Sequence, residues 1–133
     1  MNDNITSKRR IYNDIYGLGL PYRHIHPYKQ NEVKGIVDNI PAWVTHVIIF
    51  GSAVHSWHYY ENDLDVCIVG PNPGADEDDF SYRKALKQKG CSYDFVEFPD
   101  MDALFAQEID VNSIGYNILH EGVLVYEQSR LTA

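Results

Sequence analysis

The sequence predicts an α/β (α+β) domain in which helices flank a small mixed sheet, and three observations support this fold class. Nearly continuous apolar runs at 44–50 and 64–69 are typical of strands that are covered on both faces. Segments with apolar residues on one helical face lie before, between and after these runs. The chain has 133 residues, 44% hydrophobic and 23% charged, which is enough for one globular domain with its own core.

The same patterns give the order of the elements. The clearest helix covers 30–40, because Val33, Ile36 and Val37 share one face and Pro41 stops the pattern. Periodicity does not show which strands are parallel. The other expected elements are, in order, a helix at 4–16, a loop at 17–29, a strand at 44–50, a short helix at 53–60, a strand at 64–69, a helix at 76–89, a strand at 92–98, a helix capped by Asp100 that runs to about 108, a helix at 111–120 and a short strand at 123–126.

The chain shows no repeat, no low-complexity tract and no linker that would divide it. We therefore expect a single domain over 1–133, with its core at about 30–127 and an N-terminal helix and loop at 1–29.

Charge and composition exclude several function classes. The formal net charge of -8 argues against broad nucleic-acid binding, which depends on Lys and Arg contacts to phosphates. No apolar run approaches the roughly 18 residues of a membrane span, and no secretory signal is recognisable, so we expect a cytoplasmic protein without a membrane partner. Neither Cys67 nor Cys91 belongs to a CxxC pair, and Cys67 is expected to be a buried free thiol.

A candidate site combines a Gly-Ser turn with three aspartates. Gly51-Ser52 ends one strand, and ten residues later Asp63 and Asp65 open the next strand, pointing to the same face. Asp94 lies in the third strand. Alone, an Asp-x-Asp pair often just marks a turn, but three carboxylates on strands suit a hard divalent cation such as magnesium. The N–H groups after Gly51 would suit a phosphate, so the combination indicates a metal-dependent site for a nucleoside triphosphate.

Each residue has an expected role in such a site. Two cations about 3.5–4 Å apart can stabilise the attacking and leaving oxygens of a transfer reaction. Asp63 and Asp65 would bridge the two cations, while Asp94 would hold the cation beside the attacking group and help to deprotonate that group. Ser52 and the N–H groups after Gly51 would hold the terminal phosphates.

The pattern resembles the minimal nucleotidyltransferase (MNT) domains of the DNA polymerase beta-like nucleotidyltransferase superfamily. The resemblance rests on Val47-Ile48-Ile49-Phe50-Gly51-Ser52, Asn62-Asp63-Leu64-Asp65-Val66, Tyr93-Asp94-Phe95-Val96 and the segment 118–126, and it covers about 30–127. It implies a nucleotidyltransferase-like fold and an enzyme that moves a nucleoside monophosphate, with AMP from ATP the leading choice, to a hydroxyl. It also implies that Gly51 and Ser52 bind the triphosphate and that Asp63, Asp65 and Asp94 bind two Mg²⁺ ions.

The chain departs from this family in the phosphate-binding half of the motif. Family members usually continue Gly-Ser with a basic or small residue, Ala, a basic residue and Gly, whereas this chain has Ala53, Val54, His55 and Ser56. His55 is the remaining candidate for a nucleotide contact, but a histidine with a pKa near about 6.5 is only partly charged at neutral pH and lacks the bidentate geometry of Arg. A solvated helix face is the alternative reading of His55. None of the six histidines has the spacing of a structural zinc site.

Two functions remain open at this point. The first is a magnesium-dependent nucleotidyltransferase with ATP as donor. Small stand-alone members of the family are often antitoxins, so the resemblance implies a possible protein acceptor or toxin partner. The second is a catalytically inactive module of the same fold that binds a partner protein or senses a nucleotide. The loop at 17–29 is equally compatible with lining the cleft and with being an ordinary surface connection.

Overall fold

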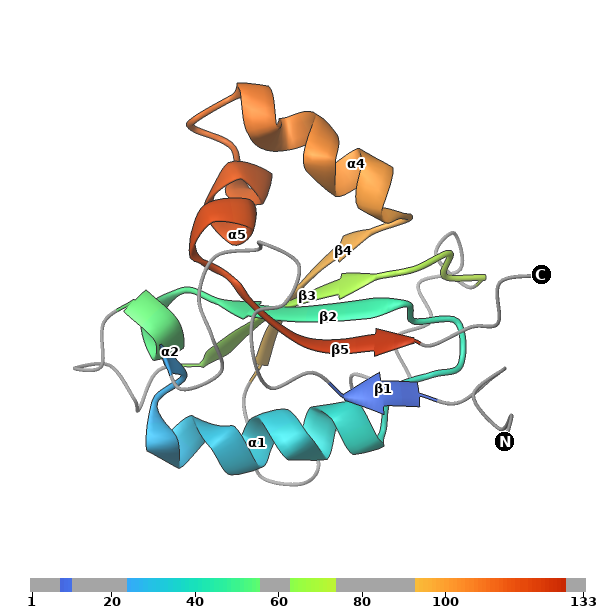
Figure 1. Cartoon of the computed structure of the whole chain (residues 1–133), viewed down its shortest axis with the longest axis vertical. Helices are drawn as coiled ribbons and strands as arrows, with labels where there is room; N and C mark the ends of the chain where they lie inside the picture. Colours follow the sequence, from blue (N-terminus) through green and yellow to red (C-terminus); the bar gives the residue numbers. More distant parts are fainter. Residues whose placement is uncertain (1–7, 11–23, 56–62, 74–92, 129–133) are drawn as a thin grey trace.

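The computed structural model describes residues 8–10, 24–55, 63–73 and 93–128, and these form a five-stranded mixed sheet with helices on both faces (Figure 1). The strand order is β1-β5-β2-β3-β4, in which β3 and β4 are parallel and the other neighbours are antiparallel. This arrangement confirms the predicted fold class. The strands are β1 (Lys8–Arg10), β2 (His46–Phe50), β3 (Leu64–Val69), β4 (Tyr93–Phe98) and β5 (Val123–Gln128).

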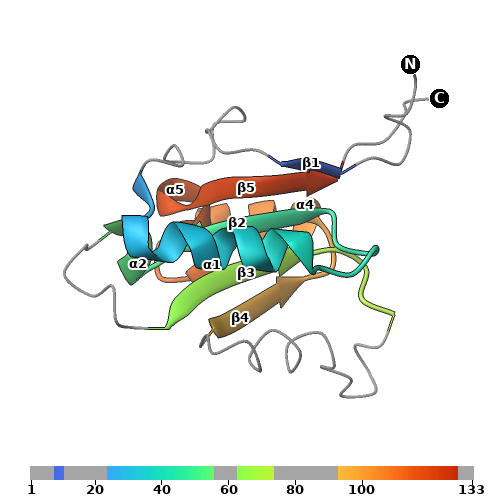
Figure 2. The ribbon, with the colours of Figure 1, turned by 90° about the horizontal axis from the view of Figure 1, so that it is seen from below.

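The helices of the described chain form two layers, one on each face of the sheet. Helix α1 lies along one face, and Figure 2 shows it crossing in front of β2 and β3. The helices α4 and α5 lie on the opposite face (Figure 1). Their bounds are α1 (Pro27–Asp38), α2 (Ser52–His55), α4 (Met101–Phe105), the 3-10 helix η5 (Ala106–Ile109) and α5 (Ile114–Glu121). No helix in the described ranges is both long and apolar enough to cross a membrane.

The core is divided by the sheet into two apolar clusters, because side chains on a strand alternate between its faces. On the α1 side, Val47 and Ile49 of β2 join Val66 of β3 and the apolar face of α1. On the other side, Ile48 and Cys67 pack with residues from α4 and α5. Since both faces are covered, β2 and β3 are mostly apolar, as their nearly continuous hydrophobic runs predicted.

The helices begin where side chains satisfy free backbone N–H groups. The His26 ring accepts a hydrogen bond from the N–H of Tyr28 at 3.1 Å, so α1 begins at Pro27, earlier than predicted. Asp100 caps α4 by accepting from the N–H of Ala103 at 2.8 Å, which confirms the expected cap. The helix that Asp100 begins continues as η5 after residue 105.

The N-terminal part of the chain corrects one expectation. A helix was predicted at 4–16, but residues 8–10 form the edge strand β1, with Lys8 opposite Gln128 and Arg10 opposite Tyr126. The apolar residues that suggested the helix, Ile11 to Tyr16, lie outside the described residues. The strand supplies backbone partners to β5, whose outer edge would otherwise be unpaired, and such long-range pairing leaves no local signal.

Candidate active site

The candidate site residues meet where the end of β2 reaches the beginnings of β3 and β4. Because β2 and β3 are antiparallel, Phe50 at the end of β2 is the register partner of Asp65 near the start of β3. Because β3 and β4 are parallel, Asp65 is in turn the partner of Asp94. The sheet topology therefore brings the Gly-Ser turn and two of the three predicted carboxylates to one edge.

The aspartates share one face of the sheet, which is the face that carries α4 and α5. Asp65 is two residues before Cys67, and Asp94 is two residues before Val96, and both of these apolar residues pack in the cluster on that side. Asp63 precedes β3 by one residue and is exposed, as is Asp94, whereas Asp65 is half-buried. The Asp-x-Asp pair therefore has one carboxylate against the core and one at the surface.

Gly51 brings the backbone of the turn directly against Asp65. Its φ of +78° is in the left-handed region that favours glycine. A Cβ atom placed on Gly51 would overlap the Asp65 carboxylate and lie only 3.1 Å from its Cβ. Two independent requirements, one conformational and one steric, therefore call for glycine at this position.

Two hydrogen bonds organise the chain after the turn. The N–H of Val54 donates to the carbonyl of Gly51 at 3.0 Å, which starts the short helix α2. The backbone of Ser52 hydrogen-bonds the Asp65 carboxylate. The Gly-Ser turn after β2 and the Asp-x-Asp segment at the start of β3 are therefore joined directly, at the same end of this antiparallel pair.

The electrostatics of the site show a concentration of negative charge around Asp65. Burial of the carboxyl group raises the pKa of Asp65 above its ordinary value, and the nearby carboxylates of Asp94 and Asp63 raise it further. The hydrogen bond from Ser52 acts in the opposite direction. A cation at this edge would remove the repulsion, and carboxylate oxygens are ligands that magnesium prefers, so the donor chemistry of these residues suits the metal that the family implies.

Some predicted site features are not tested by these contacts. Among the residues that the structure describes, no group of three Asp, Glu, His or Cys side chains stands close enough to enclose an ion. The His55 side chain and the whole segment 56–62, which includes Trp57, Tyr59 and Tyr60, lie outside the described residues. The predicted helix at 76–89 lies outside them as well. The ligand and nucleotide-binding roles of the named residues therefore stay predictions.

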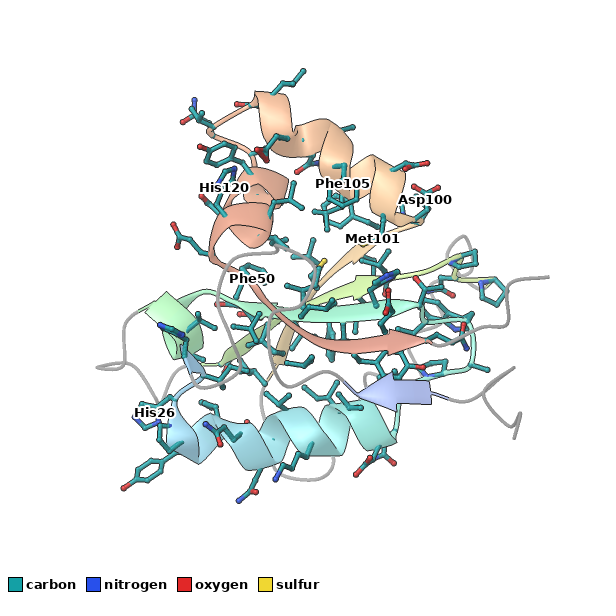
Figure 3. All side chains as sticks on the ribbon, viewed as in Figure 1. His26, Phe50, Asp100, Met101, Phe105 and His120 are labelled. Carbon is teal, nitrogen blue, oxygen red and sulfur yellow. The ribbon has the colours of Figure 1, made fainter. Side chains whose placement is uncertain are left out.

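Two neighbours of the site were not identified from the sequence. Phe50 lies opposite Asp65 and is labelled in Figure 3 on the face that carries α5, so its ring contributes to the burial of this edge. The N–H of His26 donates to the carbonyl of Ala53 at 2.8 Å, which fixes the end of the 17–29 loop beside the turn. A strand-ending aromatic residue before Gly-Ser was the available signal for Phe50. For His26, the sequence left open whether the 17–29 loop lines the cleft or is a surface connection, and it did not indicate the contact with Ala53.

Comparison with known families gave one match. Residues 30–117 match the model of a family described as a nucleotidyltransferase domain, which is more than half of the chain. Searches of curated proteins and of solved structures gave no significant match. The matched range includes most of α1, the Gly-Ser turn and all three aspartates, and it confirms the resemblance drawn from the sequence.

Proposed function

Because the chain belongs to the nucleotidyltransferase domain family, we propose that it transfers a nucleoside monophosphate, AMP from ATP, to a hydroxyl group in a magnesium-dependent reaction. A nucleoside triphosphate is the substrate that this family implies. The observation that carries the proposal is the position of Asp65, which is paired with Asp94 across β3–β4 and lies beneath the Gly51 turn. The carboxylates and the Gly51-Ser52 turn, which we propose binds phosphate, therefore lie at one small edge of the sheet.

The roles of the acidic residues follow from their exposure and position. Asp63, Asp65 and Asp94 would hold two magnesium ions, which neutralise triphosphate charge and lower the pKa of the acceptor hydroxyl when bound. Asp65 is held in place by the backbone of Ser52 and by the surrounding core. Asp94 is exposed on the neighbouring strand, where its carboxylate can accept the proton of the attacking hydroxyl.

The turn contributes through its backbone and its hydroxyl group. Without a side chain at Gly51, a phosphate can approach the main chain closely. The Ser52 hydroxyl adds a neutral donor, and His55 is our candidate for a further phosphate contact. Binding at such a turn would orient the triphosphate relative to the carboxylates, which is the main protein contribution to phosphoryl-type transfer.

The second candidate function is a non-catalytic module of the same fold that senses a nucleotide or binds a partner protein. The observation that favours it is the burial of Ala53, which is 2% exposed and occupies a position where family members often carry a basic residue. A buried methyl group supplies no charge to a triphosphate, so the Gly-Ser turn would bind the triphosphate through fewer contacts.

The acceptor that we favour is a protein. The resemblance to MNT-type antitoxins suggests a toxin as the partner, modified at a hydroxyl side chain. The described residues form one small domain around a single sheet, with no large second domain among them to bind a small-molecule acceptor.

The test pairs calorimetry with a transfer assay that uses labelled ATP. The variant that carries both Asp63→Ala and Asp65→Ala should lose magnesium-dependent ATP binding, while Asp94→Asn should lose transfer and keep more of the binding. Asp38→Asn, an exposed carboxylate at the end of α1, is the matched control and should behave like the wild type.

The outcomes separate the two functions. Equal ATP binding by the wild type and the double variant would refute the assigned site. Binding that depends on both aspartates, together with no transfer to any candidate protein, would favour the nucleotide sensor over the enzyme.

A further inference from the structure

The corner formed by α4, η5 and the start of α5 exposes large apolar side chains. We call Phe105, Ile109, Val111 and Ile114 the corner surface, with exposed fractions of 51%, 91%, 63% and 44%. They come from ten consecutive residues in α4, η5, the turn that contains Val111 and α5, and these helices lie on the face of the sheet opposite α1 (Figure 3). Scattered apolar residues on a surface are ordinary, but a group of this size in one segment is typical of an interaction site.

Hydrogen bonds hold this corner in one conformation. The Ser113 hydroxyl lies 2.8 Å from the carbonyl of Asp110 and 3.0 Å from that of Gln107. The N–H of Gly115 donates to the Gln107 side chain at 2.7 Å. The His120 ring nitrogen lies 2.8 Å from the Glu108 carboxylate, which joins η5 to α5. The exposed apolar groups are therefore presented by an ordered corner, so little conformational entropy is lost on binding.

The described segment that forms the corner, within 93–128, carries acidic side chains and no lysine or arginine. Asp102 is one helical turn before Phe105, and Glu108 and Asp110 flank Ile109. All lysine and arginine residues lie outside 90–129, and every Asp or Glu in that range adds to the same charge: Asp94, Glu97, Asp100, Asp102, Glu108, Asp110, Glu121 and Glu127.

This charge limits what can cover the corner surface. A second copy that used the same surface would bring acidic residues against acidic residues, and nucleic acids and anionic membranes would be repelled. A protein with apolar side chains bordered by lysine or arginine would complement both the apolar groups and the charge.

We propose that the corner surface is the docking site for a protein partner that presents apolar side chains bordered by basic residues. The surface is built on α4, η5 and α5, whereas the carboxylates of the candidate active site are on β3 and β4. The proposal concerns recognition and does not require nucleotidyl transfer, so it can fail or succeed independently of the proposed function.

A peptide library on phage tests the proposal. The full chain is used to select from random peptides of about 16 residues, enough for roughly four helical turns. Selection on the wild type is followed by depletion on a variant that carries Ile109→Ser and Val111→Ser. The selected peptides should combine apolar residues with Lys or Arg. A synthetic peptide of the selected sequence should bind the variant at least tenfold more weakly than the wild type.

Matched variants keep the result specific. Tyr28→Ser removes another exposed large side chain, 68% exposed on α1, and should leave peptide binding unchanged. Replacing the basic residues of the peptide by Glu should abolish binding, and raising the salt concentration should weaken it. The melting temperature of the Ile109→Ser/Val111→Ser variant should match that of the wild type, because these side chains contact solvent.

Several results would overturn the proposal. These are selected peptides that bind wild type and variant equally, peptides that lack basic residues, or failure of the wild type to select any peptide. A fall in the melting temperature of the variant would show that its side chains pack within the chain itself. Loss of a dimer in the variant by sedimentation would identify the surface as an interface between two copies.

Discussion

Substitution of Gly51 by alanine tests whether the turn and the acidic strand form one unit. Two effects oppose the alanine. A non-glycine residue at a φ of +78° costs about 1–2 kcal/mol. The new Cβ atom also overlaps the Asp65 carboxylate, so that group must move and give up its hydrogen bond to Ser52.

The expected magnitude follows from these terms. Loss of the hydrogen bond from a half-buried carboxylate adds about 1–3 kcal/mol, and the reduced entropy of the unfolded chain returns about 0.4–1 kcal/mol. We therefore expect Gly51→Ala to lower the free energy of unfolding by about 1–4.5 kcal/mol. This is less than the 5–15 kcal/mol or so of a typical domain, so the variant should still fold.

The assay is urea denaturation of four proteins: wild type, Gly51→Ala, Asp65→Ala and the double variant. Removing the Asp65 carboxylate removes the overlap but not the backbone strain, so the two effects should be less than additive by at least about 1 kcal/mol. Gly35→Ala is the matched control, because no atom lies within 4 Å of a Cβ placed at that helical position. It should raise stability by roughly 0.5–1 kcal/mol.

Two results would contradict this picture of the turn: Gly51→Ala is as harmless as Gly35→Ala, or the effects of Gly51→Ala and Asp65→Ala simply add. Either result would mean that the Asp65 carboxylate does not lie against the turn.

Three further predictions concern other parts of the described chain. In a Cys91→Ser variant, the Cys67 thiol should resist alkylation at pH 8, because burial raises the pKa of Cys67 from 9.0 to about 12. The contribution of the protonated thiol to stability should be complete below pH 9.0 and lost between pH 9.0 and 12, which denaturation at several pH values can measure. Rapid labelling of the folded variant would contradict this. Ser113→Ala should destabilise the protein by about 0.5–2 kcal/mol in the same denaturation assay, because it removes the cap of α5, whereas Ser113→Thr should cost less. Asp94→Asn should raise the free energy of unfolding in a chelator by about 0.2–1 kcal/mol, because it removes a like charge opposite Asp65, and a loss of stability would contradict the pairing.

Elements with a strong local pattern were predictable from the sequence. The bounds of β3 were predicted at 64–69 and are confirmed as Leu64–Val69, because an apolar run bounded by polar residues and glycine leaves little choice. The predicted helix at 30–40 is confirmed, but α1 starts at Pro27. Pro27 lies in the range predicted as a loop, 17–29, although proline is also favourable at the first position of a helix.

Features that depend on long-range pairing were not predictable. The pairing of β1 with β5 joins residues at opposite ends of the chain, and the local sequence suggested a helix instead. The parallel arrangement of β3 and β4 was left open because the period of two is the same in parallel and antiparallel strands. The period of two also indicated that Asp63 and Asp65 share a face. It did not indicate that Asp65 would be packed against the turn, because that contact depends on the pairing of β2 with β3.

The structure also changes how the altered phosphate motif should be interpreted. The sequence suggested two separable halves, an intact set of carboxylates and a weakened Gly-Ser clamp. In the fold these halves touch, because the backbone of Gly51 lies against Asp65 and Ser52 hydrogen-bonds the same carboxylate. Ala53, by contrast, points into the core. Ala53 therefore supplies no cation contact, and it leaves the junction between Gly51 and Asp65 undisturbed. Nucleotide binding should accordingly depend more on this junction than on the side chains that follow it, and Gly51→Ala should weaken ATP binding more than Ser52→Ala does.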